Sequence, residues 1–249
     1  PLAALVRPAG VSPAHRPQRI SWFKAEETAA ICFGDRSVAL RGGPCRSPLE
    51  NVPHRHYDTG SIIYRARGEN LVCDSGFNSY DATFWDAYDE PDHLVSSAEL
   101  HNIPLADGRG FRHEDCARGG GVRCEELRRG FGAIIYRLSA PVPGIAAWER
   151  QVLLVENGPL CVVDQMLPDE AGTLSVIWHL HDEARPGGEE GEFVTSGLNL
   201  RAAANREIAA EVAADHPRPY VRLDVGAAGD GPAVAQRPRR AQPAAGGLG

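Results

Sequence analysis

Short apolar runs separated by glycine- and proline-rich turns fill the central part of the chain, and this pattern restricts the fold more than any other feature. The runs cover residues 37–40, 61–66, 70–74, 132–138, 148–155, 160–164 and 174–180. Arg67-Gly68-Glu69 separates the second run from the third, and Glu156-Asn157-Gly158-Pro159 separates the fifth from the sixth. Both linkers are typical of tight turns between paired strands. Short strands without intervening helices predict an all-β fold, which we expect to be a large sandwich of antiparallel strands.

The chain divides into four segments by composition. Residues 1–18 are rich in proline, alanine and arginine, and we interpret them as a linker or the remnant of a preceding domain. Residues 19–199 contain the strand pattern and form the β-domain. Residues 200–215 (LRAAANREIAAEVAAD) favour a short helix by propensity. Residues 216–249 form a low-complexity tail that we expect to be disordered, because it has few apolar residues to offset the loss of chain entropy.

Net charge and hydropathy exclude two classes of partner. The 249-residue chain carries a formal net charge of −7, whereas non-specific nucleic-acid binding requires a basic surface. The sequence has no run of eighteen apolar residues, so no membrane-spanning helix is expected. The first residues lack the apolar stretch of a signal peptide, so the chain shows no address for export.

The densest group of polar side chains is His54-Arg55-His56-Tyr57-Asp58. In an extended segment, residues two positions apart point to the same side, so His54 and His56 would face one cleft together. Imidazoles placed in this way bind metal ions or share acid–base catalysis. The alternative is a pair of solvated histidines in a surface loop.

Asp74 and His101 extend this group towards a metal site. Asp74 ends the apolar run 70–74, where a carboxylate needs a partner, and His101 lies in another apolar stretch. Two histidines and one aspartate are a plausible set of zinc ligands. The alternatives are a turn-capping aspartate and a hydrogen-bonded core histidine.

Four stretches resemble the C-terminal β-sandwich domain of the heparinase II/III family of polysaccharide lyases. They are HRHYDTGSIIYRARGENLVCDSGFNSYD (54–81), SSAELHNIPLADG (96–108), WERQVLLVENGPLCVVDQM (148–166) and VIWHLHDE (176–183). Their order and spacing follow the family pattern over residues 20–183. The first two stretches together are fairly specific, and the last two are weak on their own.

The resemblance implies a role for each matching residue. His54 matches the catalytic histidine, and Tyr80 lies where an aromatic hydroxyl would approach the cleft. Arg55, Tyr57 and Asn102 are expected to contact substrate, and Asn102 also to orient the residues around it. His56, Asp74 and His101 match a zinc site seen in part of the family, so the resemblance implies that these three residues bind a structural zinc ion.

The implied reaction is β-elimination on a uronate-containing polysaccharide of the glycosaminoglycan or alginate type. A base removes the proton at C5, and the glycosidic bond at C4 breaks to leave an unsaturated sugar. The C5 proton becomes acidic only when the neighbouring carboxylate is neutralised, so cationic or hydrogen-bonding groups must face that carboxylate.

In these lyases the other half of the active site comes from an N-terminal α/α toroid domain, and no corresponding series of helical hairpins precedes residue 20 of this chain. We therefore expect this chain to be part of a larger enzyme and to show little or no lyase activity alone. The resemblance also implies a periplasmic or secreted location.

Two other functions fit parts of the sequence. The first is a non-catalytic glycan-binding sandwich, for which Phe84, Trp85 and Tyr88 are the candidate aromatic platform. The second is a cupin-type metal enzyme, which also uses an H-x-H pair on a β-scaffold. Cupins place a glutamate four or five residues after the second histidine, where this chain has Gly60 and Ser61.

Overall fold

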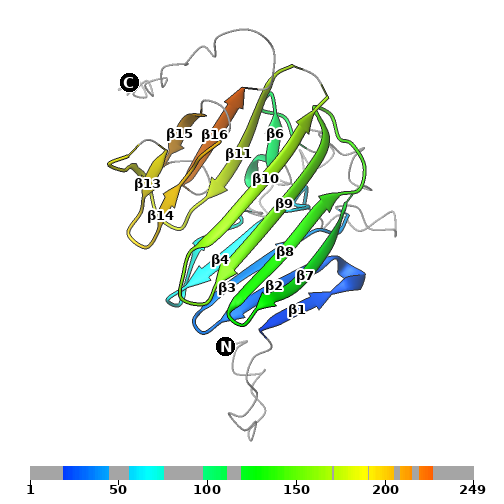
Figure 1. Cartoon of the computed structure of the whole chain (residues 1–249). Coiled ribbons are helices and arrows are strands. Elements are labelled where there is room, and N and C mark those ends of the chain that lie inside the picture. Colours follow the sequence, from blue (N-terminus) through cyan, green and yellow to red (C-terminus); the bar gives the residue numbers. More distant parts are fainter. Residues whose placement is uncertain are drawn as a thin grey trace, which may run out of the picture.

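Antiparallel strands make up almost all of the described structure (Figure 1). The computed structural model describes residues 19–44, 56–75, 98–110, 119–169, 171–189, 191–204, 208–214 and 219–226. Within these residues the only helical elements are two short 3-10 turns, η1 (Lys24–Glu26) and η2 (Ala98–Leu100). The predicted all-β class is therefore confirmed.

The first layer is a five-stranded sheet with the order β1-β2-β3-β4-β5. Its strands are β1 (Ile20–Phe23), β2 (Thr28–Phe33), β3 (Arg36–Arg41), β4 (Ile62–Ala66) and β5 (Glu69–Val72). Alternation of buried and exposed residues is clearest in β2 and β4, as expected when one face of a sheet covers a core.

A four-stranded sheet with the order β10-β9-β8-β7 lies across β1 and β2 and closes the sandwich. Its strands are β7 (Gly120–Arg128), β8 (Phe131–Leu138), β9 (Ile145–Val155) and β10 (Leu160–Pro168). These are the longest strands of the described structure, and they run side by side across the front of Figure 1.

Two further sheets continue the structure beyond β5. One has the order β15-β16-β11-β6 and the other β12-β13-β14. Their strands are β6 (Pro104–Ala106), β11 (Thr173–His179), β12 (Arg185–Pro186), β13 (Glu192–Val194), β14 (Asn199–Arg201), β15 (Ile208–Ala213) and β16 (Tyr220–Gly226). A bridge between Val72 and Leu180 joins the end of β5 to the end of β11. The five-stranded sheet therefore continues into the β15-β16-β11-β6 sheet.

Both hairpins expected from turn chemistry are present. β4 and β5 pair through Arg67 and Gly68, which have φ values of 53° and 86° and therefore both adopt left-handed backbone. β9 and β10 pair from Leu154↔Leu160 onward, on either side of the predicted Asn-Gly turn. In the β4–β5 turn, the two left-handed central residues match the right-handed twist of the paired strands.

The predicted helix over 200–215 is wrong. β14 ends at Arg201, and β15 pairs with β16 in an antiparallel register that sets Ile208 opposite Val225 and Val212 opposite Val221. Alanine and glutamate favour a helix in isolation, but pairing with a neighbouring strand overrides this weak preference. The long apolar core continues to this end of the molecule, where Val221 is fully buried.

No helix within the described ranges combines the length and the apolar content that a bilayer crossing requires. The core lies between the layers and includes Ile31, Leu40, Ile134, Val152 and Leu154. The polar residues described next lie at one edge of this core, where β3 ends and β4 begins.

Candidate functional site

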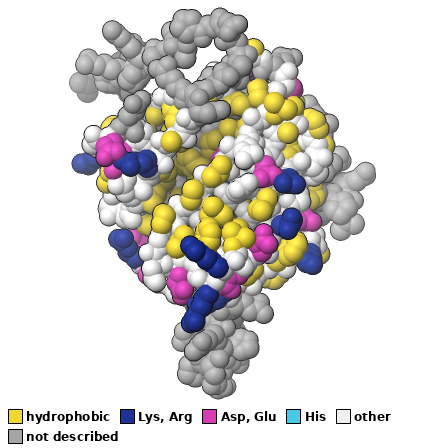
Figure 2. Space-filling model, in the orientation of Figure 1, with side chains coloured by type: hydrophobic (Ala, Val, Ile, Leu, Met, Phe, Trp, Pro, Cys, Tyr) yellow, Lys and Arg dark blue, Asp and Glu magenta, His cyan; other side chains and the backbone are white. Residues whose placement is uncertain are grey.

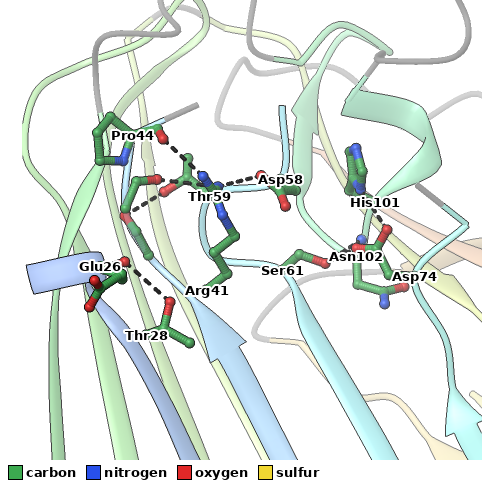
Figure 3. Close-up of polar contacts among 12 residues, drawn as sticks. Glu26, Thr28, Arg41, Pro44, Asp58, Thr59, Ser61, Asp74, His101 and Asn102 are labelled. Carbon is green, nitrogen blue, oxygen red and sulfur yellow. Dashed lines mark hydrogen bonds and ion pairs between the residues drawn. The ribbon is translucent and has the colours of Figure 1, made fainter. Parts of the chain in front are cut away.

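A tight loop at residues 56–61 leads into β4 and is fixed to the end of β3. Asp58 forms an ion pair with Arg41, and the Thr59 hydroxyl donates a hydrogen bond to the Gly42 carbonyl at 2.8 Å (Figure 3). Gly60 has a φ of +82°, and a Cβ there would lie 2.2 Å from the Trp148 ring. Only glycine fits this combination of left-handed backbone and close ring contact. These contacts therefore hold the backbone of residues 56–61 in one conformation.

Asp74 and His101 form the central contact of the site. His101 Nδ1 lies 2.8 Å from Asp74 Oδ1, and the Ser61 hydroxyl donates to Asp74 Oδ2 at 2.8 Å, so Asp74 lies between these two residues in Figure 3. Burial alone would raise the pKa of Asp74, but the hydrogen bond and charge of His101 and the hydrogen bond of Ser61 outweigh it and lower that pKa. Asp74 is therefore held as a carboxylate.

His56 lies beside His101. The two ring centroids are 5.3 Å apart, with a tilt of 36° between the ring planes. Burial first, and then the charge of His101, lowers the pKa of His56 below 6.5, so His56 is neutral at neutral pH. A neutral imidazole is the form that binds a metal ion or accepts a proton.

Asn102 is fully buried, and protein groups use its polar atoms. Its amide nitrogen donates to the carbonyls of Ile62, at 2.8 Å, and of Cys73. Its amide oxygen accepts a hydrogen bond from the backbone N–H of His179 at 2.7 Å. Asn102 thus joins three strand ends beneath the site, and the substrate contact expected for it stays a prediction. Tyr57, also predicted as a substrate contact, is 8% exposed and packs with the core.

Asp58 is the second partly buried carboxyl group near the histidines. Burial raises its pKa, and the Arg41 guanidinium only partly offsets this effect. Burial thus works against the ionised form, and the ion pair with Arg41 works for it.

The imidazole pair provides two candidate metal-binding nitrogens. His101 Nε2 is buried, and none of the described residues is within hydrogen-bonding distance of it. Because Nδ1 of the same ring contacts Asp74, this nitrogen can carry the lone pair that a metal ion needs. No group of three His, Cys, Asp or Glu side chains in the described part of the chain has the geometry of a metal site. In this arrangement Asp74 contacts Nδ1 of His101, and its expected role as a zinc ligand stays a prediction.

Three predicted residues, the catalytic His54 and Tyr80 and the substrate contact Arg55, lie outside the described residues. The candidate aromatic platform of Phe84, Trp85 and Tyr88 also lies outside them. Of the predicted set, the structure brings together His56, Asp74, His101 and Asn102, from three separate segments of the sequence.

A groove of about 1380 Å³ opens between β10 and the β11–β16 pair, away from this site. Its lining includes Val162, Met166, Leu200 and Leu223, and none of the histidines contributes to it. Figure 2 shows hydrophobic side chains gathered in the hollow on this face. Its lining is mixed, because Asp35, Tyr64, Glu156 and Asp164 line it together with these apolar residues.

A buried arginine that contacts both histidine-bearing segments was not predicted from the sequence. Arg150 is fully buried and donates from Nε to Asp164 Oδ1 at 2.8 Å and from Nη2 to Asp164 Oδ2 at 2.9 Å. The sequence did contain a signal for it. Arg150 occupies the same strand face as the core residues Trp148, Val152 and Leu154, which lie at every second position. An ionisable residue at such a position requires a buried partner.

Comparison with known proteins shows a shared fold. The sequence matches no protein-family model and no curated protein sequence. The structure is similar to heparinase III, with a TM-score of 0.66 and 15% identity over 86% of this chain and 35% of that one. It is also similar to heparan sulfate lyase HepC from Pedobacter heparinus, with a TM-score of 0.54 and 16% identity over 77% of this chain and 30% of that one. The chain thus spans about a third of the length of these lyases.

Proposed function

We propose that this chain is the β-domain of a polysaccharide lyase that cleaves a uronate-containing polysaccharide by β-elimination. The observation that carries the proposal is the meeting of His56, Asp74 and His101 at one end of a sandwich with the fold of part of heparinase III. These residues come from the two stretches whose motifs resemble the lyase family. Neither the fold nor the motifs alone would support this function, because one fold carries many activities.

In the proposed reaction, the fixed loop 56–61 supports the substrate end of the site. His54 acts on the uronate, either by neutralising its carboxylate or by taking part in proton transfer, and Tyr80 supplies a hydroxyl near the leaving oxygen. The buried Asp74 carboxylate holds the His101 ring with Nε2 facing away from it. No redox step is required, because elimination only moves a proton and breaks a carbon–oxygen bond.

We further propose that His56 and His101 hold a structural zinc ion, with Asp74 orienting His101. Zinc bound there would tie the loop 56–61 to the segment around His101 and supply cross-linking without redox chemistry. Two observations support this part of the proposal: the buried Nε2 of His101 has no hydrogen-bond partner among the described residues, and the pKa of His56 is lowered. The remaining ligands would come from water or from residues outside the described ranges.

The proposal includes a partner domain. The chain spans about a third of the matched lyases, and we propose that an α/α toroid domain completes the site. A periplasmic or secreted location belongs to the same proposal.

The test is reconstitution. The purified chain is mixed with heparan sulfate, alginate or another uronate polymer, first alone and then with a toroid domain supplied on a separate chain or by fusion. We expect unsaturated uronate, followed by its ultraviolet absorbance, only in the reconstituted sample, and we expect His54→Ala to abolish it. An unsaturated product from the chain alone would contradict the half-site model. Polysaccharide binding without any product, even after reconstitution, would favour the glycan-binding alternative.

A further inference from the structure

Arg150 makes four hydrogen bonds that join β9 and β10 to both histidine-bearing segments. Two of its nitrogens bind Asp164, which lies opposite Arg150 in the β9–β10 register. The third nitrogen, Nη1, donates to the Gly60 carbonyl at 2.9 Å and also to the Asn102 carbonyl. The remaining contacts are with aromatic rings.

Two tryptophans fix the plane of the guanidinium. The guanidinium carbon of Arg150 lies 5.0 Å from the ring centroid of Trp148 and 5.0 Å from that of Trp178. Trp148 Nε1 also donates to Asp164 Oδ1 at 2.8 Å, so the carboxylate is held by the same ring. A planar, weakly hydrated guanidinium suits such a stacked position, whereas a lysine ammonium does not.

The two carbonyls that Nη1 contacts belong to the segments that carry the imidazoles. Gly60 ends the loop that begins at His56, and Asn102 directly follows His101. A single nitrogen atom therefore fixes the distance between these segments. A buried ion pair by itself is weak evidence for stability, because the desolvation cost of both charges offsets their attraction. The contribution of this pair is to fix the position of the guanidinium that joins the two segments.

We propose that Arg150 is the positioning residue for the His56–His101 pair, with Asp164 as its anchor. Arg150 sets the separation and tilt of the two rings through the Gly60 and Asn102 carbonyls and contacts neither ring itself. The inference deepens the proposed function, on which it rests for the view that the pair is the functional centre. The geometry of the pair can nevertheless be measured without any enzymatic activity.

The test uses three variants of the full chain. Arg150→Lys keeps the charge but cannot span both carbonyls and Asp164. The double variant Arg150→Met with Asp164→Leu replaces the whole buried pair with apolar side chains, a change that proteins often tolerate without loss of stability. The control is Arg36→Lys, since Arg36 also donates to two carbonyls, those of Val155 and Gly158, but at the opposite end of β3.

Two readouts follow for each folded variant. The first is the set of ¹⁵N ring signals of His56 and His101 at about pH 8, where unperturbed imidazoles are neutral. The second is the affinity for Co²⁺, a spectroscopic substitute for zinc. We expect both Arg150 variants to shift the ring signals and to bind Co²⁺ at least about tenfold more weakly, as for other residues that orient metal ligands. Arg36→Lys should leave both readouts at wild-type values.

Unchanged ring signals in a folded Arg150 variant would overturn the inference. Loss of the folded state in both Arg150 variants would also overturn it, because Arg150 would then be a requirement for folding and not a positioning residue. A wild-type chain that binds no Co²⁺ would contradict the proposed zinc site, but the ring signals would still decide the role of Arg150.

Discussion

Asp74 accepts a hydrogen bond from His101 at 2.8 Å and thereby determines which nitrogen of that ring is free. The contact occupies Nδ1, and the buried Nε2 is left without a partner among the described residues. A carboxylate that binds one imidazole nitrogen raises the basicity of the other. The same contact places Asp74, expected to be a zinc ligand, on the Nδ1 side of His101.

Replacing Asp74 with alanine removes this acceptor. Ser61 and the buried His101 ring both lose their hydrogen-bond partner, and an unsatisfied buried donor costs about 1–3 kcal/mol. We expect the free energy of unfolding to fall by about 2–4 kcal/mol, measured by urea denaturation of the metal-free chain. Asp35→Ala, at an exposed position, is the control and should stay within about 0.5 kcal/mol of wild type.

Elemental analysis of the purified chain tests the metal proposal. We expect about one zinc per chain in the wild type and loss of that zinc in His56→Ala and in His101→Ala, since each removes one of the two imidazole ligands. His181→Ala, at an exposed histidine outside the site, should retain it. A metal-free wild type would return His56 and His101 to structural roles and favour a plain sandwich.

The stability of the metal-free chain should depend on pH through His56. Burial, and then the charge of His101, lowers the folded-state pKa of His56, so below pH 6.5 the unfolded chain takes up the proton first. The contribution of His56 is fully present above pH 6.5 and is lost as the pH falls towards the folded-state pKa. Urea denaturation at a series of pH values should show this decline, and His56→Ala should weaken it. An identical decline in the variant would assign the effect to other groups.

Gly60→Ala and Gly34→Ala form a matched pair. Both glycines have positive φ, of +82° and +62°, so both variants bear the strain of left-handed backbone. A Cβ at Gly34 meets nothing within 4 Å, whereas one at Gly60 meets the Trp148 ring. We expect Gly60→Ala to cost about 1–3 kcal/mol more than Gly34→Ala, because overpacking adds to the strain. Equal losses of thermal stability would show that the loop can move away from Trp148.

Asn102→Ala tests the hydrogen-bonding role of the Asn102 side chain against the substrate contact predicted for it. Truncation leaves the buried carbonyls of Ile62 and Cys73 and the N–H of His179 without this partner. We expect a loss of about 3 kcal/mol or more, from unsatisfied buried groups. The exposed Asn199 bonds only to Glu192 through its side chain, and Asn199→Ala should cost less than about 0.5 kcal/mol. A stable Asn102→Ala variant with weakened polysaccharide binding would support the predicted substrate contact.

The strands of the two hairpins were predictable because their information is local. Alternating apolar residues and turn-forming dipeptides lie within a few positions of each other, and β3, β4, β5, β8, β9, β10 and β11 all coincide with predicted runs. β15 was not predictable in this way, because its alanines favour a helix and only its pairing with β16 makes it a strand.

The candidate site was predictable in its residues but not in its geometry. The motifs around His56, Asp74 and His101 indicated a shared site, and the structure places the three together. The roles of Asp74 and Asn102 depended on which atoms meet, which no spacing along the chain reveals. Arg150 was missed because its partners Gly60 and Asn102 are 90 and 48 positions away.

The same separations affect how the molecule folds. The contacts of Nη1 with Gly60 and Asn102 can form only after β9 has joined the sandwich, because Arg150 follows both segments by many residues. Closing loops of this size delays such contacts relative to local hairpins. During synthesis, the histidine-bearing segments therefore leave the ribosome well before the strand that fixes their separation, and the site is completed only when the second sheet docks.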